Sequence, residues 1–77
     1  MGVVLVTRQG CHLCDEALSL IRELGVEPEL ADVDADEGLF KLYDWRVPVV
    51  LVRGQVAAEG RIDRDRLRKA LTPELRP

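Results

Sequence analysis

Aromatic residues, cysteines and histidine are scarce in this sequence, and each scarcity excludes something. Phe, Trp and Tyr together make up 4% of the 77 residues, so the core must be built from Leu, Val and Ala. With two Cys and one His, a single molecule cannot supply the four ligands typical of a closed zinc site. No apolar run approaches the ~18 residues of a membrane span, and the first residues lack the cationic start and cleavage site of a signal peptide. We therefore expect one cytoplasmic domain, residues 1–77, that is monomeric and does not bind a membrane.

The charge balance argues against nucleic acid as the main partner. The net charge is −3, whereas a protein that neutralises phosphates needs a basic face. One local exception is a basic cluster near the C-terminus. We interpret this cluster as the solvated face of a helix, with cations near the negative end of the helix dipole. Its members are Arg61, Arg64, Arg66, Arg68 and Lys69.

The hydrophobic pattern predicts an α/β domain with the order β-α-β-α-β-β-α. Aliphatic runs typical of strands buried on both faces of a parallel sheet alternate with segments of helical periodicity. The two β-α-β steps imply right-handed crossovers between parallel strands, and the last two strands form an antiparallel hairpin. The expected strands are residues 3–7, 29–33 (at a sheet edge), 49–52 and 56–58, and the expected helices are residues 11–24, residues 37–44 and a segment between Asp63 and Pro73.

Turn and capping residues mark the ends of these elements. Gly54 and Gln55 have the composition of a two-residue hairpin turn. The expected caps are Asp34 or Asp36 for the short helix and Asp63 for the last helix, which Pro73 closes. The apolar residues expected to face inward on the three helices are Leu13, Ala17, Leu20, Ile21, Leu24, Leu39, Phe40, Tyr43, Leu67, Ala70 and Leu71.

The strongest functional signal is the pair Cys11 and Cys14, which lies where a buried strand gives way to a helix. The Cys11 sulfur should lie near the free N–H groups of the first helical turn, which stabilise the reactive thiolate. Cys14 is close enough for its sulfur to turn inward and meet the first one. This arrangement suits a dithiol that attacks a disulfide with Cys11 and resolves the mixed intermediate with Cys14.

His12 and a metal are the alternatives to weigh at this motif. As a cation, His12 would favour the Cys11 thiolate. It could equally be exposed on the first helical turn without a role, since adjacent helix positions do not face one another. A metal site would need two molecules, with two cysteines from each chain or one from each together with two external thiols.

Several landmarks in order resemble the glutaredoxin branch of the thioredoxin superfamily. They are Thr-Arg-Gln-Gly-Cys-His-Leu-Cys-Asp-Glu-Ala at residues 7–17, Val-Pro at 47–48, Gly54, and Gly-Arg-Ile-Asp at 60–63. The sequence is most similar to small bacterial glutaredoxin-like proteins with a Cys-His-Leu-Cys active site, over residues 3–71. The resemblance implies the thioredoxin/glutaredoxin fold, a four-stranded mixed sheet with helices on both faces.

The resemblance also implies roles for individual residues. Cys11 would be the nucleophile and Cys14 the resolving thiol. The Val47–Pro48 peptide bond would be cis, with the proline facing the active site. The backbone of Val47 would pair with an extended substrate strand. Independently of the resemblance, the position of Arg46 just before Val47 leads us to expect an anion contact there.

Glutathione is the co-substrate that the resemblance implies. Arg8 matches a cation that glutaredoxins carry three residues before the first cysteine. Gly60 and Asp63 match part of a segment that holds the γ-glutamyl end of glutathione, whereas Arg61 and Arg64 depart from it. The expected substrate-binding residues are Arg8, Gly10, His12, Val47, Pro48, Gly60, Arg61 and Asp63.

Three functions follow from these observations. The first is a thiol–disulfide oxidoreductase that acts on a disulfide-containing or glutathionylated protein, with no tightly bound cofactor, and takes electrons from glutathione or a thioredoxin-type reductase. The second is a dimeric carrier of an iron–sulfur cluster or zinc through Cys11. The third is a non-catalytic module that docks on a partner through Val47–Pro48 and the basic helix.

Overall fold

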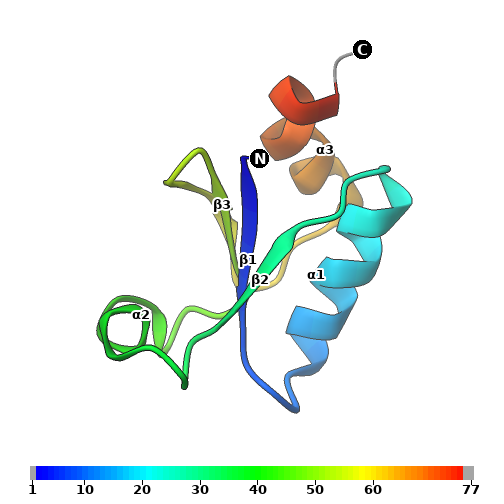
Figure 1. Cartoon of the computed structure of the whole chain (residues 1–77). Helices are drawn as coiled ribbons and strands as arrows, with labels where there is room; N and C mark the ends of the chain where they lie inside the picture. Colours follow the sequence, from blue (N-terminus) through cyan, green and yellow to red (C-terminus); the bar gives the residue numbers. More distant parts are fainter. Residues whose placement is uncertain (1, 76–77) are drawn as a thin grey trace.

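Four strands form one mixed sheet in the spatial order β2-β1-β3-β4, with helices on both faces (Figure 1). The computed structural model describes residues 2–75, and the side chains of residues 2–72. In the described part of the chain no helix is long and apolar enough to cross a membrane. The elements are β1 (Val3–Thr7), α1 (His12–Glu23), β2 (Glu29–Asp32), α2 (Glu37–Tyr43), β3 (Val49–Val52), β4 (Gln55–Glu59) and α3 (Arg64–Leu75).

The strand directions confirm the first parallel step and correct the second. β1 and β2 are parallel, and β2 lies at the edge of the sheet as predicted. β3, however, runs antiparallel to β1, with Val6 opposite Val49. The prediction of a second parallel β-α-β step is therefore wrong. A strand buried on both faces has a continuous apolar run, and such a run carries no signal of strand direction.

An aliphatic core lies on each face of the sheet. On one face α1 and α3 cover β1, β3 and β4, and on the other face α2 packs against the sheet. No aromatic side chain within residues 2–72 is fully buried, which agrees with the expected aliphatic core. The fully enclosed residues of the α1/α3 core include Leu5, Ile21, Val50, Leu67 and Leu71.

Three of the predicted details of the helices are wrong. The basic cluster was expected near the negative end of the helix dipole, but α3 begins at Arg64 and has no basic residue in its last turn, so the cluster lies towards the positive end. Phe40 was expected to face inward but is 43% exposed, because α2 has only two turns and buries a single row of side chains. That row contains Leu39 and Tyr43, four residues apart. Pro73 was expected to close the last helix, whereas α3 continues to Leu75. A proline inside a helix removes one hydrogen bond and crowds the carbonyl four residues earlier, but this local cost does not end α3 at Pro73.

The hairpin between β3 and β4 turns one residue earlier than predicted. Its two central residues are Arg53 and Gly54, with φ angles of 54° and 83°. Gln55, which was expected in the turn, is the first residue of β4 and pairs with Val52. Two positive φ angles define a type I′ turn, whose twist matches that of the strands. Glycine suits either central position of this turn, so the sequence alone left the register one residue uncertain.

Candidate functional site

The predicted site residues come from three loops that meet at one end of the sheet. The loop with Cys11 follows β1, and the loop with Pro48 precedes β3. Val6 lies opposite Val49 in the antiparallel pair of β1 and β3. Pro48, which directly precedes Val49, therefore lies beside the end of β1. The Gly60 N–H, after β4, donates to the Pro48 carbonyl at 2.9 Å. The sheet therefore brings together residues that are about fifty positions apart.

Cys11 caps α1 with its sulfur. Its backbone is extended, and its Sγ accepts a hydrogen bond from the Cys14 N–H at 3.1 Å. Cys11 is half-buried. A free helix N–H and the positive end of the helix dipole both stabilise a negatively charged sulfur. This confirms the predicted position of Cys11 at the start of the helix.

Cys14 is a free thiol like Cys11, but it lies inside the protein. Only 1% of its surface is exposed. Burial raises the pKa of the Cys14 thiol, and its hydrogen bond with Cys11 adds to the rise. Hydrogen bonds from the Thr7 side chain and the Arg8 backbone act in the opposite direction. The two cysteines are thus unequal: one can meet an external disulfide, whereas the other can react only within the molecule.

The segment before β3 is held in place from two sides. The Val47–Pro48 peptide bond is cis, and Pro48 is fully buried. Arg46 donates to both carboxylate oxygens of Glu59, at 2.6 and 2.9 Å, and its guanidinium lies 5.2 Å from the Tyr43 ring centre. Arg46 is therefore an anchor for this segment as well as an expected anion contact.

Arg8 is held by two carboxylates within the protein. It donates to both oxygens of Asp34 at 2.8 Å and to the Asp44 carboxylate, and it reaches the Asp44 carbonyl at 3.2 Å. These hydrogen bonds raise the pKa of the Arg8 guanidinium. The partners tie the loop before Cys11 to the segments at both ends of α2. Binding of a substrate anion by Arg8 stays a prediction.

The remaining predicted residues lie in the loop before α1, on its first turn, and in the segment between β4 and α3. Gly10 and Gly60 both have positive φ angles, of 79° and 71°, which favour glycine over other residues. His12 is exposed on the first turn of α1, and Arg61 is exposed after β4. Asp63 caps α3 as predicted, since its Oδ1 accepts the Arg66 N–H at 2.8 Å.

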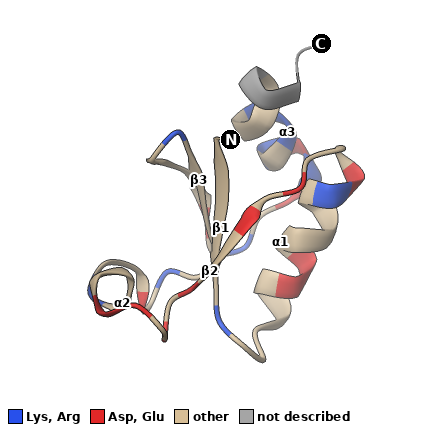
Figure 2. Ribbon diagram, viewed as in Figure 1, with Lys and Arg blue, Asp and Glu red and all other residues tan. Residues whose placement is uncertain are grey.

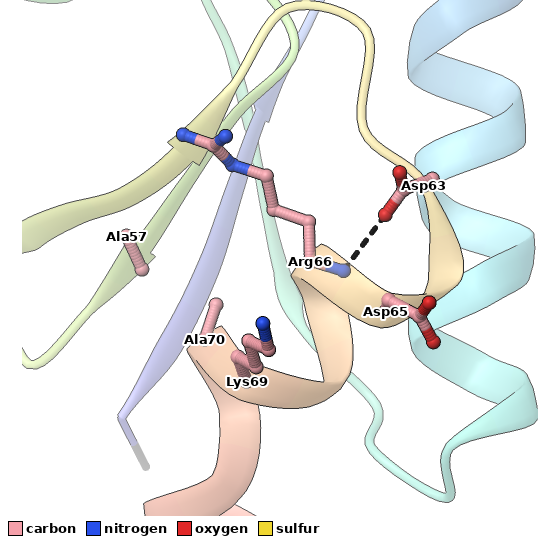
Figure 3. Close-up of a pocket in the computed structure, with 6 residues that line it drawn as sticks. All are labelled: Ala57, Asp63, Asp65, Arg66, Lys69 and Ala70. Carbon is pink, nitrogen blue, oxygen red and sulfur yellow. Dashed lines mark hydrogen bonds between the residues drawn. The ribbon is translucent and has the colours of Figure 1, made fainter.

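A surface pocket of about 520 Å³ begins at Asp63 and extends along α3 towards β4 (Figure 3). It is lined by Ala57, Asp63, Asp65, Arg66, Lys69 and Ala70. Neither cysteine lines it, so this pocket is separate from the dithiol. Among the described residues, no three His, Cys, Asp or Glu side chains are grouped as a metal site.

A second cavity, which the sequence analysis missed, borders Cys14. It also measures about 520 Å³, and its lining includes Thr7, Cys14, Asp15 and Asp32. The parallel pairing of β1 and β2 places Thr7 opposite Asp32. The signal that could have revealed this pair is the common position of both residues at the end of adjacent strands, but their register was not predictable from composition.

A mixed four-stranded sheet with three helices, and two nearby cysteines where β1 leads into α1, define a protein of the thioredoxin-like fold class. The chain belongs to the glutaredoxin-like domain family (DUF836), whose family model matches residues 2–72. This confirms the resemblance inferred from the sequence motifs. A comparison with curated proteins finds no match.

Two solved structures support the assignment of the fold. Protein XcR50 from X. campestris is 29% identical, with a TM-score of 0.78, and the similarity covers 92% of this chain and 96% of that one. Protein Ne2328 from Nitrosomonas europaea is 33% identical, with a TM-score of 0.72, and the similarity covers 86% of this chain and 85% of that one. Both similarities extend over most of each chain.

Proposed function

We propose that this protein is a thiol–disulfide oxidoreductase that reduces protein disulfides or glutathione mixed disulfides with Cys11 and Cys14. The observation that carries the proposal is the unequal exposure of two cysteines, in which the Cys11 sulfur accepts a hydrogen bond from the backbone N–H of Cys14. Cys11 is half-buried at the start of α1, its sulfur lies 3.1 Å from the backbone nitrogen of Cys14, and the Cys14 side chain is buried. Membership of the glutaredoxin-like family fits a redox role.

The reaction follows from this geometry in two steps. The Cys11 thiolate attacks one sulfur of the substrate disulfide, and the other sulfur leaves as a thiolate that takes a proton from solvent. Cys14 then loses its proton and attacks the Cys11 sulfur, which releases the second substrate thiol. The products are a reduced substrate and a Cys11–Cys14 disulfide. Two electrons from glutathione or a thioredoxin-type reductase return the protein to the dithiol.

Substrate binding is proposed around the Cys11 sulfur. The backbone of Val47 would pair with an extended substrate segment, and Gly10, Gly60 and the exposed His12 and Arg61 would line its path. To bind glutathione, Arg8 would have to contact the ligand while it keeps its ion pair with Asp34. Asp63 would likewise have to contact the ligand while it accepts the Arg66 N–H. The variant Asp63→Asn separates these roles, because asparagine keeps the helix cap and loses the charge. If Asp63 binds the glutathione amine, this variant should raise KM for glutathione without lowering Tm.

The test is a redox titration of the wild type and two cysteine variants. Each protein is equilibrated in glutathione buffers, its thiols are trapped by alkylation, and the species are read as intact masses. We expect a reversible intramolecular disulfide in the wild type and a stable glutathione adduct in Cys14→Ser. Cys11→Ser should show neither and should lose all reductase activity. Full activity in Cys11→Ser, or wild-type thiols that stay reduced in every buffer, would overturn the proposal.

A further inference from the structure

The cavity beside Cys14 lies between the first turns of α1 and the edge of the sheet. Leu5, Thr7, Leu30 and Asp32 line it from β1 and β2, and Cys14 and Leu18 line it from α1. In parallel strands, register partners point to the same face. Thr7 and Asp32 are such partners, as are Leu5 and Leu30. Since Leu5 packs in the core beneath α1, the four side chains all lie on the α1 face.

The position of the cavity beside Cys14 matters because the resolving step requires the Cys14 thiol to lose its proton. Cys14 must lose a proton before it can attack the Cys11 sulfur, yet its thiol is almost fully buried. Burial makes the charged form of a thiol costly. Thr7 lines the cavity together with Cys14, and its side chain opposes the rise in the pKa of the Cys14 thiol. The proton therefore needs a route from an enclosed sulfur to solvent.

We propose that the cavity is the proton exit of the resolving step, in which the Thr7 hydroxyl holds the forming Cys14 thiolate and the Asp32 carboxylate receives its proton through water. The inference rests on the proposed oxidoreductase function and deepens it. The proton passes from Cys14 to cavity water and on to Asp32, which is exposed and returns it to solvent. The Cys14 thiolate then forms the bond to Cys11 while the substrate sulfur leaves with the electron pair. A cavity of about 520 Å³ is larger than the ~30 Å³ that one water molecule occupies.

Asp32 fits this role better than the other charged groups near Cys14. One of its carboxylate oxygens accepts the Asp34 N–H at 2.8 Å, which leaves the other available. Asp15 also lines the cavity, but it directly follows Cys14 on α1, and adjacent positions on a helix do not face one another. Arg8 lines the cavity as well, but Asp34 and Asp44 bind its guanidinium. Cys11, the remaining titratable neighbour, is in the mixed disulfide during this step.

The test follows both steps in one reaction with 5,5′-dithiobis(2-nitrobenzoate). Attack by Cys11 releases one thionitrobenzoate ion, and closure by Cys14 releases a second, so rapid mixing across a pH series gives each rate separately. We expect Asp32→Asn to slow the second release about a hundredfold near neutral pH, at the low end of general-base contributions, and to leave the first release unchanged. Asparagine keeps an oxygen to accept the Asp34 N–H, so the local turn is preserved.

Glu29→Gln is the matched control. Glu29 lies on the same strand but, three residues from Asp32, on the opposite face of the sheet, and its variant should leave both rates unchanged. Thr7→Val should move the pH midpoint of the second release upward, and Thr7→Ser should restore it. An Asp32→Asn profile that superposes on the wild-type profile overturns the proton exit alone. A wild type that never releases the first thionitrobenzoate overturns the proposed function instead.

Discussion

Among the charged side chains, Arg8 connects three separate segments of the protein. Its own position follows β1, Asp34 lies between β2 and α2, and Asp44 follows α2. The guanidinium contacts both oxygens of Asp34, a paired geometry that the single ammonium of lysine cannot reproduce. Arg8 therefore contributes to the position of the loop that carries Cys11.

We predict that Arg8→Lys lowers Tm and slows the first reaction of Cys11 with a disulfide reagent, because the loop loses its fixed connection to α2. Arg22→Lys is the control: Arg22 makes a similar paired contact with Glu27, but both side chains are more exposed and only five residues apart. Such surface pairs contribute little to stability. Thermal melts monitored by circular dichroism check the first effect. Equal Tm values for the two variants would contradict the assigned role.

At the scale of single residues, what the sequence could predict depended on distance along the chain. Cys11 and Cys14 are three residues apart, so the change from strand to helix was enough to place one sulfur at the helix start and the other inside. The partners of Arg8 lie 26 and 36 residues away. They depend on how the loops meet in three dimensions, and no local pattern encodes that meeting. The Thr7 and Asp32 pair was missed for the same reason.

Among the secondary-structure elements, the β3–β4 hairpin depends most clearly on a single glycine. Gly54 has a φ angle of 83° in the type I′ turn, and no atom lies within 4 Å of the position of an added Cβ. Space is therefore available, and the strain of a positive φ alone opposes other residues. We predict that Gly54→Ala lowers the free energy of unfolding by about 1 kcal/mol.

Gly54→Asn provides the comparison, because asparagine tolerates the left-handed region and is common in such turns. Urea unfolding of both variants should show the asparagine protein between the alanine protein and the wild type. An alanine variant as stable as the wild type would mean that the hairpin has another turn in solution. The backbone contact from the Arg53 N–H to the Gly2 carbonyl, at 2.7 Å, does not depend on the side chain at position 54.

A hydrophobic pattern predicts where a helix or strand lies, but not how that element is oriented against its neighbours. Periodicity located all seven elements, because burial of one helix face or of a whole strand leaves a repeat in the sequence. It did not reveal that β3 is antiparallel to β1, nor that α3 extends past Pro73. Both features depend on contacts between elements, which outweigh the local preference of a strand or a proline.

Across the whole molecule, acidic and basic residues are interspersed (Figure 2) and form ion pairs between distant segments. Besides the Arg8 pairs, Arg46 joins Glu59 and Arg64 joins Glu23. These pairs link the segment before β3 to β4, and α3 to the end of α1. The net charge of −3 therefore coexists with ion pairs that connect different elements of the fold.

These ion pairs predict how stability responds to pH. Hydrogen bonds from arginines lower the pKa of Asp34 and Glu59 below their ordinary values of 3.8 and 4.5. A carboxylate with a lowered pKa stabilises the folded state above its unfolded pKa and loses that contribution as the pH falls through the folded value. Burial of Cys14 has the opposite sign: its pKa is raised above 9.0, so its contribution is complete below pH 9.0 and is lost at higher pH.

We therefore expect a plateau of stability between about pH 5 and pH 8, with a decline on both sides. The two limbs have separable causes. Glu59→Gln should flatten the acid limb, and salt should do so too, because exposed pairs are screened. Cys14→Ala should flatten only the alkaline limb. Urea midpoints measured from pH 3 to pH 10 check both limbs, and an alkaline limb unchanged in Cys14→Ala would show that the buried thiol does not control it.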